Sequence, residues 1–250
     1  MMRIALIGTG NLALHLVNAF ETCNTTQLVQ WIGRKKTPPK QNLNIPYYTE
    51  YQQSIDVDLC LIAITDDAIS YVAEQLKKTD VLVAHTAGAV SMDQLNPIKH
   101  IGVFYPLQSF KSTIPTNWSN IPICIEAKHK KDIKLLEKIA SQLSESVHQI
   151  SESQRLQLHT AAVFANNFCN HLIGVSQSIT AKAALPFSVL QPLIRETFER
   201  SFSNQATALQ TGPAKRNDAI TQKKHLSVLS EEDAKLYRIL SQSIFNTHNT

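Results

Sequence analysis

A glycine-rich turn near the start of the chain has the residue types and spacing that bind a dinucleotide. The turn spans residues 8–13, reads GTGNLA, follows an apolar run and precedes a helical pattern. Gly8 suits a tight turn, Gly10 lets a pyrophosphate approach the backbone, and Ala13 lets the helix pack on the strand. The first amide groups of this helix would face the phosphates. A plain tight turn is the alternative, but the context favours cofactor binding by Gly8, Thr9, Gly10, Asn11 and Leu12.

Basic residues stand where the second strand of such a unit should end. The apolar run 27–32 is followed by Gly33, Arg34, Lys35 and Lys36. An NAD-binding unit carries an acidic residue near this point, which holds the ribose 2′-hydroxyl. Arg34 and Lys35 could instead pair with a 2′-phosphate. A basic surface loop is the alternative, but the position favours NADP(H) over NAD(H).

Polar residues follow two further apolar runs, and ligands of open α/β sheets bind at such strand ends. Thr65 and Asp66 follow the run 58–64, and one of the acids Asp66 and Asp67 is expected to cap the next helix. A second strand, 80–84, is closed by His85 and Thr86, which could touch the nicotinamide ribose. We therefore predict that cofactor contacts are made by Thr65, Asp66, His85 and Thr86.

A polar stripe interrupts an otherwise apolar helical pattern in the second half of the chain. At 100° per residue, His159, Asn166 and Asn170 share a narrow arc, and Asn167 and His171 lie on the adjoining flank. These groups could bind substrate oxygens, or they could satisfy hydrogen bonds between helices.

Transfer of a hydride to a carbonyl or imine needs a nearby proton donor. His159 is the best-suited group because imidazole titrates near neutrality. Tyr105 and His85, at predicted strand ends, are the other candidates.

Composition excludes several classes of protein. The chain has 250 residues, 43% hydrophobic and 18% charged, with a net charge of +4. The longest strongly apolar run, 59–64, is too short to cross a bilayer, and we expect a cytoplasmic protein without a signal peptide. The basic runs carry no nucleic-acid motif. No metal site is predicted, since the nine histidines are dispersed without an HExxH motif. The four cysteines are expected to be buried free thiols.

The elements that position these residues form two domains. Strands are expected over 4–7, 27–32, 45–48, 58–64, 80–84, 100–104, 121–126 and 147–150. From residue 151 only helical periodicity follows, with helices expected over 154–184, 186–200, 217–227 and 230–245. We therefore predict an α/β Rossmann-type parallel-sheet domain over 1–150 and an all-α domain over 151–250. A substrate would lie in the cleft between them.

Five motifs together resemble those of the Rossmann-like putative NADP oxidoreductases with a helical carboxyl-terminal domain of unknown function. They span residues 8–13, 85–88, 102–110, 159–171 and 211–218. The two-domain plan is distantly similar to pyrroline-5-carboxylate reductase and the 3-hydroxyacid dehydrogenases, with a helical domain like the carboxyl-terminal domain of 6-phosphogluconate dehydrogenase. The resemblance implies NADP(H) as cofactor and a homodimer formed through the helical domains.

The resemblance also selects site residues. By position it matches His159, Asn167, Asn170, His171 and Arg216, whereas Asn166 falls at a variable position. The sequence departs from the family at Tyr105, where many relatives have histidine. The lysine that hydroxyacid dehydrogenases place on the first interdomain helix has no counterpart, which argues against a simple 3-hydroxyacid substrate.

These observations lead to one hypothesis and a rival. The hypothesis is an NADP(H)-dependent oxidoreductase acting on a small polar substrate. His159 would donate or accept the proton, Asn167 and Asn170 would orient the substrate, and Arg216 could reach an acidic group on it. The rival is a non-catalytic NADP(H)-sensing dimer that acts through a partner protein. A weaker alternative is a reductase that passes its hydride to a deazaflavin or a metal chelate.

Overall fold

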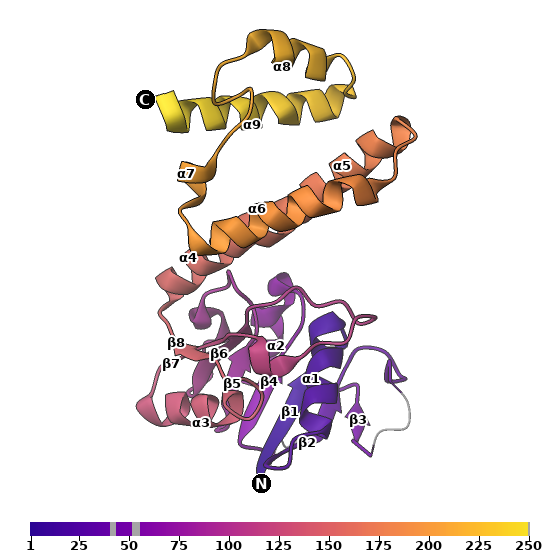
Figure 1. Ribbon diagram of the computed structural model, residues 1–250. Coiled ribbons are helices and arrows are strands. Elements are labelled where there is room, and N and C mark those ends of the chain that lie inside the picture. Colours follow the sequence, from indigo (N-terminus) through magenta and orange to yellow (C-terminus); the bar gives the residue numbers. More distant parts are fainter. Residues whose placement is uncertain (41–43, 52–55, 250) are drawn as a thin grey trace. The chain divides into compact units, whose positions relative to one another are not determined.

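The computed structural model describes residues 1–40, 44–51 and 56–249. Within it the chain divides into two compact units, Met1–Val163 and Phe164–Thr250 (Figure 1). The first is the predicted Rossmann-type α/β fold, and the second is built of helices. The first unit extends beyond the expected domain boundary at residue 150, because the helix that follows this point groups with the sheet.

One sheet forms the centre of the first unit, with the strand order β3-β2-β1-β4-β5-β6-β7-β8. Neighbouring strands pair in parallel except β6 and β7, which are antiparallel. The strand bounds are β1 Met2–Ile7, β2 Thr26–Ile32, β3 Tyr47–Tyr48, β4 Leu59–Ile62, β5 Leu82–His85, β6 Ile101–Pro106, β7 Ile123–Ala127 and β8 Val147–Gln149. Each predicted strand overlaps one of these. The doubly wound order brings the carboxyl ends of β1, β2, β4 and β5 to one edge.

Helices cover both faces of this sheet, as the alternation of strand side chains requires. Ile4 and Leu6 of β1 belong to a core that includes side chains of α1 and α3, whereas Ala5 and Ile7 join a second core with α2. Figure 1 shows these helices around the sheet. The helix bounds in this unit are α1 Asn11–Glu21, α2 Ile69–Gln75, α3 Lys130–Ala140 and α4 Glu152–Ala162. The central strands are apolar along most of their length because both faces of the sheet are buried.

The long helix predicted over 154–184 consists of three segments. After α4 the backbone forms a π-helical segment, Val163–Phe168, before α5, Cys169–Lys182. A π-helical turn closes i→i+5 hydrogen bonds and so holds more residues than an α-helical turn. The uniform 100° per residue assumed for this stretch therefore does not apply in the segment, and the division between the two units falls within it.

The second unit contains four helices besides α5 among its described residues. They are α6 Gln191–Ser203, α7 Ala206–Leu209, α8 Ala219–Leu226 and α9 Glu231–Asn249. The helix expected over 186–200 is split, because a 3₁₀ turn precedes α6 and Pro192 occupies the first turn of α6. The short α7 was not predicted. No helix within the described ranges is both long and apolar enough to cross a bilayer.

The four cysteines are free thiols, as predicted. Cys60 and Cys124 are buried in strands, whereas Cys23 and Cys169 are only partly buried, contrary to expectation. Burial raises the pKa of the Cys60 thiol to about 12, because it disfavours the thiolate. Cys60 is therefore an inert core residue.

Candidate functional site

A cavity of about 500 Å³ lies at the carboxyl ends of β1, β2, β4 and β5. Its lining includes most of the residues predicted to bind a cofactor. These are Gly8, Thr9, Gly10, Asn11, Leu12, Arg34, Thr65 and Thr86. Segments that are distant in the sequence thus converge where ligands of open α/β sheets bind.

The glycine turn between β1 and α1 is shaped by two close approaches. Gly8 has a φ of +129°, and a Cβ there would lie 2.0 Å from the carbonyl oxygen of Ala63. The carbonyl of Gly8 accepts a 2.7 Å hydrogen bond from the indole of Trp31. Gly10 is the N-cap of α1, and a Cβ on it would meet no atom within 4 Å. Gly8 is therefore required by the fold, whereas Gly10 leaves open space before the helix N-terminus.

Three of the predicted cofactor residues lie outside this lining. The backbone carbonyl of Lys35 accepts a 2.9 Å hydrogen bond from the Tyr47 hydroxyl. Asp66 lies in a 3₁₀ turn over Asp66–Ala68 that precedes α2. Contrary to expectation, neither Asp66 nor Asp67 caps α2, whose N-cap is Ala68 and has no side-chain cap.

The third of them, His85, supports the loop that follows β5. Its side chain is completely buried, and Nδ1 accepts a 3.2 Å hydrogen bond from the amide of Ala87. Burial, together with the positive charge of Arg155, lowers the pKa of His85 to about 4. The imidazole is therefore neutral at physiological pH and is a poor candidate for the proton donor.

The other two proton-donor candidates lie together. The hydroxyl of Tyr105, at the end of β6, is 2.9 Å from Nδ1 of His159 on α4. Gly88 lies against this pair, since a Cβ there would be 2.6 Å from Nδ1 of His159. Burial raises the pKa of Tyr105 to about 12, with a further increase from Cys124. Tyr105 therefore stays a neutral phenol that can hold Nδ1, which leaves Nε2 of His159 for a substrate.

A buried arginine one turn before His159 fixes the loop after β5. Nη1 of Arg155 donates hydrogen bonds to the carbonyls of Ala87 at 3.1 Å, Gly88 at 3.1 Å and Val90 at 2.7 Å. Nη2 lies 3.5 Å from a carboxylate oxygen of Glu126 on β7. Arg155 is 1% exposed. Nε and Nη2 have no hydrogen-bond partner among the described residues, so the buried charge relies on the three carbonyls at Nη1 and on Glu126.

The start of α4 is anchored by three further contacts. Ser151 forms a capping box with the helix. Glu126 accepts a 3.0 Å hydrogen bond from the amide of Glu152, where the helix dipole favours a negative charge. Ser91 donates a 2.7 Å hydrogen bond to the carboxylate of Glu152. The contacts with Glu126 and Ser91 hold α4, and with it His159, against β7 and the loop after β5.

The other predicted catalytic residues belong to the helical unit. Asn167 lies in the π-helical segment, Asn170 and His171 lie in α5, and Arg216 lies in the loop before α8. All four are exposed within the chain. The side-chain amides of Asn167 and Asn170 are exposed, so within this chain they do not require hydrogen-bond partners.

Arg155 and Glu126 are the site residues that the sequence analysis missed. Arg155 precedes His159 by four residues and so shares its helix face, which is a usable signal. Glu126 ends a strand-like run and gives no comparable signal. The pairing of two charges from β7 and α4 depends on the fold.

Comparisons with known proteins agree with this architecture. Residues 121–244 match the model of a domain of unknown function, DUF2520. A structure of a "putative NADP oxidoreductase" from Bacteroides fragilis is 33% identical, with a TM-score of 0.88 over 98% of each chain. No curated protein matches the chain.

Two more distant structures share the fold. A protein from Thermotoga maritima is 18% identical with a TM-score of 0.69, and the alignment covers 98% of each chain. A pyrroline carboxylate reductase from Plasmodium falciparum, solved with NADP bound, is 13% identical with a TM-score of 0.63 over 98% of each chain. At these identities the likeness concerns the fold alone.

Proposed function

The chain belongs to the family of putative NADP oxidoreductases that carry this helical domain of unknown function, and from that premise we propose that it is an NADP(H)-dependent oxidoreductase acting on a small polar substrate. The observation that carries the proposal is the Tyr105–His159 pair, held within the same unit as the glycine-rich cavity. A proton donor and a dinucleotide cradle are the two parts that this chemistry needs.

The residues of the cavity fit NADP(H). The open space before Gly10 is a cradle that a Cβ would fill, and it adjoins the amide groups that begin α1. The exposed Arg34 lines the same cavity at the end of β2, where a 2′-phosphate would lie. When bound, the nicotinamide would supply or accept the hydride.

His159 would move the proton in this reaction. Nδ1 is paired with the Tyr105 hydroxyl, so the ring presents Nε2 to a substrate. The imidazole is only partly buried, which leaves it accessible. Tyr105 would keep the ring in one orientation, while Arg155 and Gly88 hold the loop against which the ring packs.

The cofactor preference can be measured by calorimetric titration of the protein with NADPH and with NADH. We expect micromolar binding of NADPH and at least tenfold weaker binding of NADH, because an arginine pairs with a 2′-phosphate that NADH lacks (about 1.4 kcal/mol per tenfold). Arg34→Ala should remove most of this difference.

The control for this titration is Lys138→Ala, which removes an exposed cation of α3 that is not among the cavity residues. It should leave both affinities unchanged. Equal affinity for the two nucleotides, or an Arg34→Ala variant that keeps its preference, would contradict the 2′-phosphate assignment. If neither nucleotide binds, the oxidoreductase proposal fails.

We also propose a homodimer formed through the helical unit. Of the described residues from Phe164 onward, only Ala214 and Ala234 are buried in the chain. Large apolar side chains on these helices are exposed, among them Phe202 at 84% and Phe164 at 64%. Helices that bury so few side chains within the chain need a further surface to pack against, and a second copy of the chain would supply it.

The dimer can be tested by light scattering after size-exclusion chromatography. The wild type should have twice the 27.9 kDa mass of the chain. Phe202→Glu should shift the population towards monomer, because it places a charge on an apolar surface that the second copy would bury. Ile114→Glu is the control, since Ile114 is an exposed apolar residue of the first unit. A wild-type monomer at tens of micromolar protein would contradict the proposal.

The four polar residues of the helical unit remain predictions for substrate binding. Asn167, Asn170 and His171 would orient substrate oxygens, and Arg216 would pair with an acidic group. Cofactor binding without NADPH turnover across a broad set of carbonyl and imine compounds would favour the rival, a nucleotide-sensing dimer.

A further inference from the structure

Two histidines and an aspartate gather at the opposite edge of the sheet from the cofactor cavity. His100 directly precedes β6, while His129 is the N-cap of α3 and Asp132 lies in its first turn. β6 has six residues, so its amino end lies about 20 Å from its carboxyl end. This cluster is therefore separate from the proposed oxidoreductase site.

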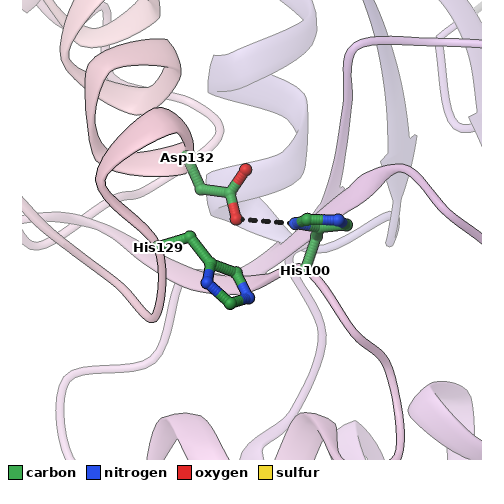
Figure 2. Close-up of side chains that lie close together, drawn as sticks. All are labelled: His100, His129 and Asp132. Carbon is green, nitrogen blue, oxygen red and sulfur yellow. Dashed lines mark hydrogen bonds and ion pairs between the residues drawn. The ribbon is translucent and has the colours of Figure 1, made fainter.

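The three side chains point toward a common space, as Figure 2 shows. One ligand atom from each lies within 4.8 Å of the other two. Nδ1 of His100 and Oδ2 of Asp132 are 2.9 Å apart. Neighbouring ligands of a tetrahedral zinc ion bound at about 2.0–2.1 Å are about 3.3–3.4 Å apart, so this pair would need to separate by only about 0.4 Å.

We propose that His100, His129 and Asp132 form a zinc site. Two imidazoles and a carboxylate are ligands that zinc accepts, and water would complete a tetrahedral set. The ion would replace the proton shared by His100 and Asp132. His129 is partly exposed and makes no side-chain cap on α3, so its ring can close the remaining gap. The site would fasten the start of α3 to the start of β6.

The positive charge of a neighbouring lysine should weaken zinc binding at this site. Nζ of Lys131 lies 3.4 Å from Nε2 of His100, on the ring whose other nitrogen faces Asp132. The Lys131 residue is exposed, so its flexible side chain can swing into solvent. Its charge still repels a cation at this distance, and Lys131→Gln should therefore strengthen zinc binding about tenfold.

The test is calorimetric titration of tag-free, chelator-treated full-length protein with zinc chloride. The wild type should bind one equivalent with micromolar or tighter affinity. His129→Ala should weaken that equivalent at least 100-fold, and it leaves the His100–Asp132 hydrogen bond in place. His148→Ala is the matched control, because His148 is an exposed histidine of β8 that bonds to Ser146 instead.

A second measurement guards against variants that fail to fold. Zinc should raise the melting temperature of the wild type and of His148→Ala, but not that of His129→Ala, because an ion that binds only the folded state stabilises it. The site would be ruled out by wild-type binding weaker than 100 µM or by the same affinity in His129→Ala. If Lys131→Gln bound zinc with the affinity of the wild type, this would also contradict the proposal that the ion lies beside His100.

Discussion

Replacing His159 with alanine is expected to lower turnover by a factor of about 10² to 10⁴, which is the usual contribution of a positioned general acid or base. The expectation rests on Nε2, the ring nitrogen that faces away from the 2.9 Å contact with Tyr105. NADPH affinity should change little, since His159 is not among the residues that line the cavity. Steady-state kinetics with a substrate found by screening NADPH oxidation would measure the effect.

The helical unit provides a matched control for this experiment. Nδ1 of His225 lies 2.9 Å from the hydroxyl of Tyr237, and the two rings pack edge to face with centroids 5.7 Å apart. The Tyr105–His159 pair has the same hydrogen-bond length and a centroid distance of 5.9 Å. His225→Ala should therefore leave turnover within about twofold. A folded His159→Ala enzyme with normal turnover would exclude the proposed proton transfer.

Tyr105→Phe separates the positioning of His159 from its chemistry. The variant keeps the aromatic ring but removes the hydroxyl that holds Nδ1. We expect kcat to fall about tenfold, less than in His159→Ala, with KM nearly unchanged, because the imidazole loses the contact that orients it but keeps its chemistry. A merely structural tyrosine would change stability without lowering kcat.

The cofactor cavity was largely predictable from the sequence because its parts are local. The turn from Gly8 to Leu12 and the basic residue Arg34 occupy fixed offsets along one βαβ unit. The order of parallel strands then brings their carboxyl ends together without any further information. Lys35, Asp66 and His85, also predicted to contact a cofactor, do not line this cavity, since strand-end position alone does not say which way a side chain points.

The proton-donor pair could not be predicted in the same way. Tyr105 and His159 were separate candidates, and 54 residues separate them in the sequence. Their contact requires α4 to pack beside the end of β6, and this packing depends on Glu126 and Arg155, which join β7 to α4. The π-helical segment was equally hidden from the sequence, because the prediction assumed a uniform α-helical period through Val163–Phe168.

Arg155 is expected to be the side chain whose loss most destabilises the first unit. Arg155→Met should lower the free energy of unfolding by about 3 kcal/mol or more, the cost of removing one partner of a buried ion pair. The methionine would leave the carbonyls of Ala87, Gly88 and Val90 without their donor and Glu126 without its cation. Urea unfolding followed by circular dichroism would measure the change.

The matched control is Arg3→Ala, in the same unit. Arg3 pairs with Asp56, but both side chains are well exposed, at 46% and 88%. Water screens such a pair, so its loss should cost less than about 1 kcal/mol. If Arg155→Met and Arg3→Ala lost similar amounts of unfolding free energy, burial would not increase the contribution of Arg155 to stability.

Arg155→Lys would distinguish charge from geometry. An ammonium keeps the positive charge beside Glu126, but it lacks the planar fork with which the guanidinium contacts several partners at once. We therefore expect partial recovery of stability. Turnover should recover less, because the carbonyl of Gly88 accepts one of the lost hydrogen bonds and its Cα packs against the ring of His159. If Arg155→Lys restored stability and turnover equally, the loop would need only the charge, and the placement of His159 would depend on other contacts.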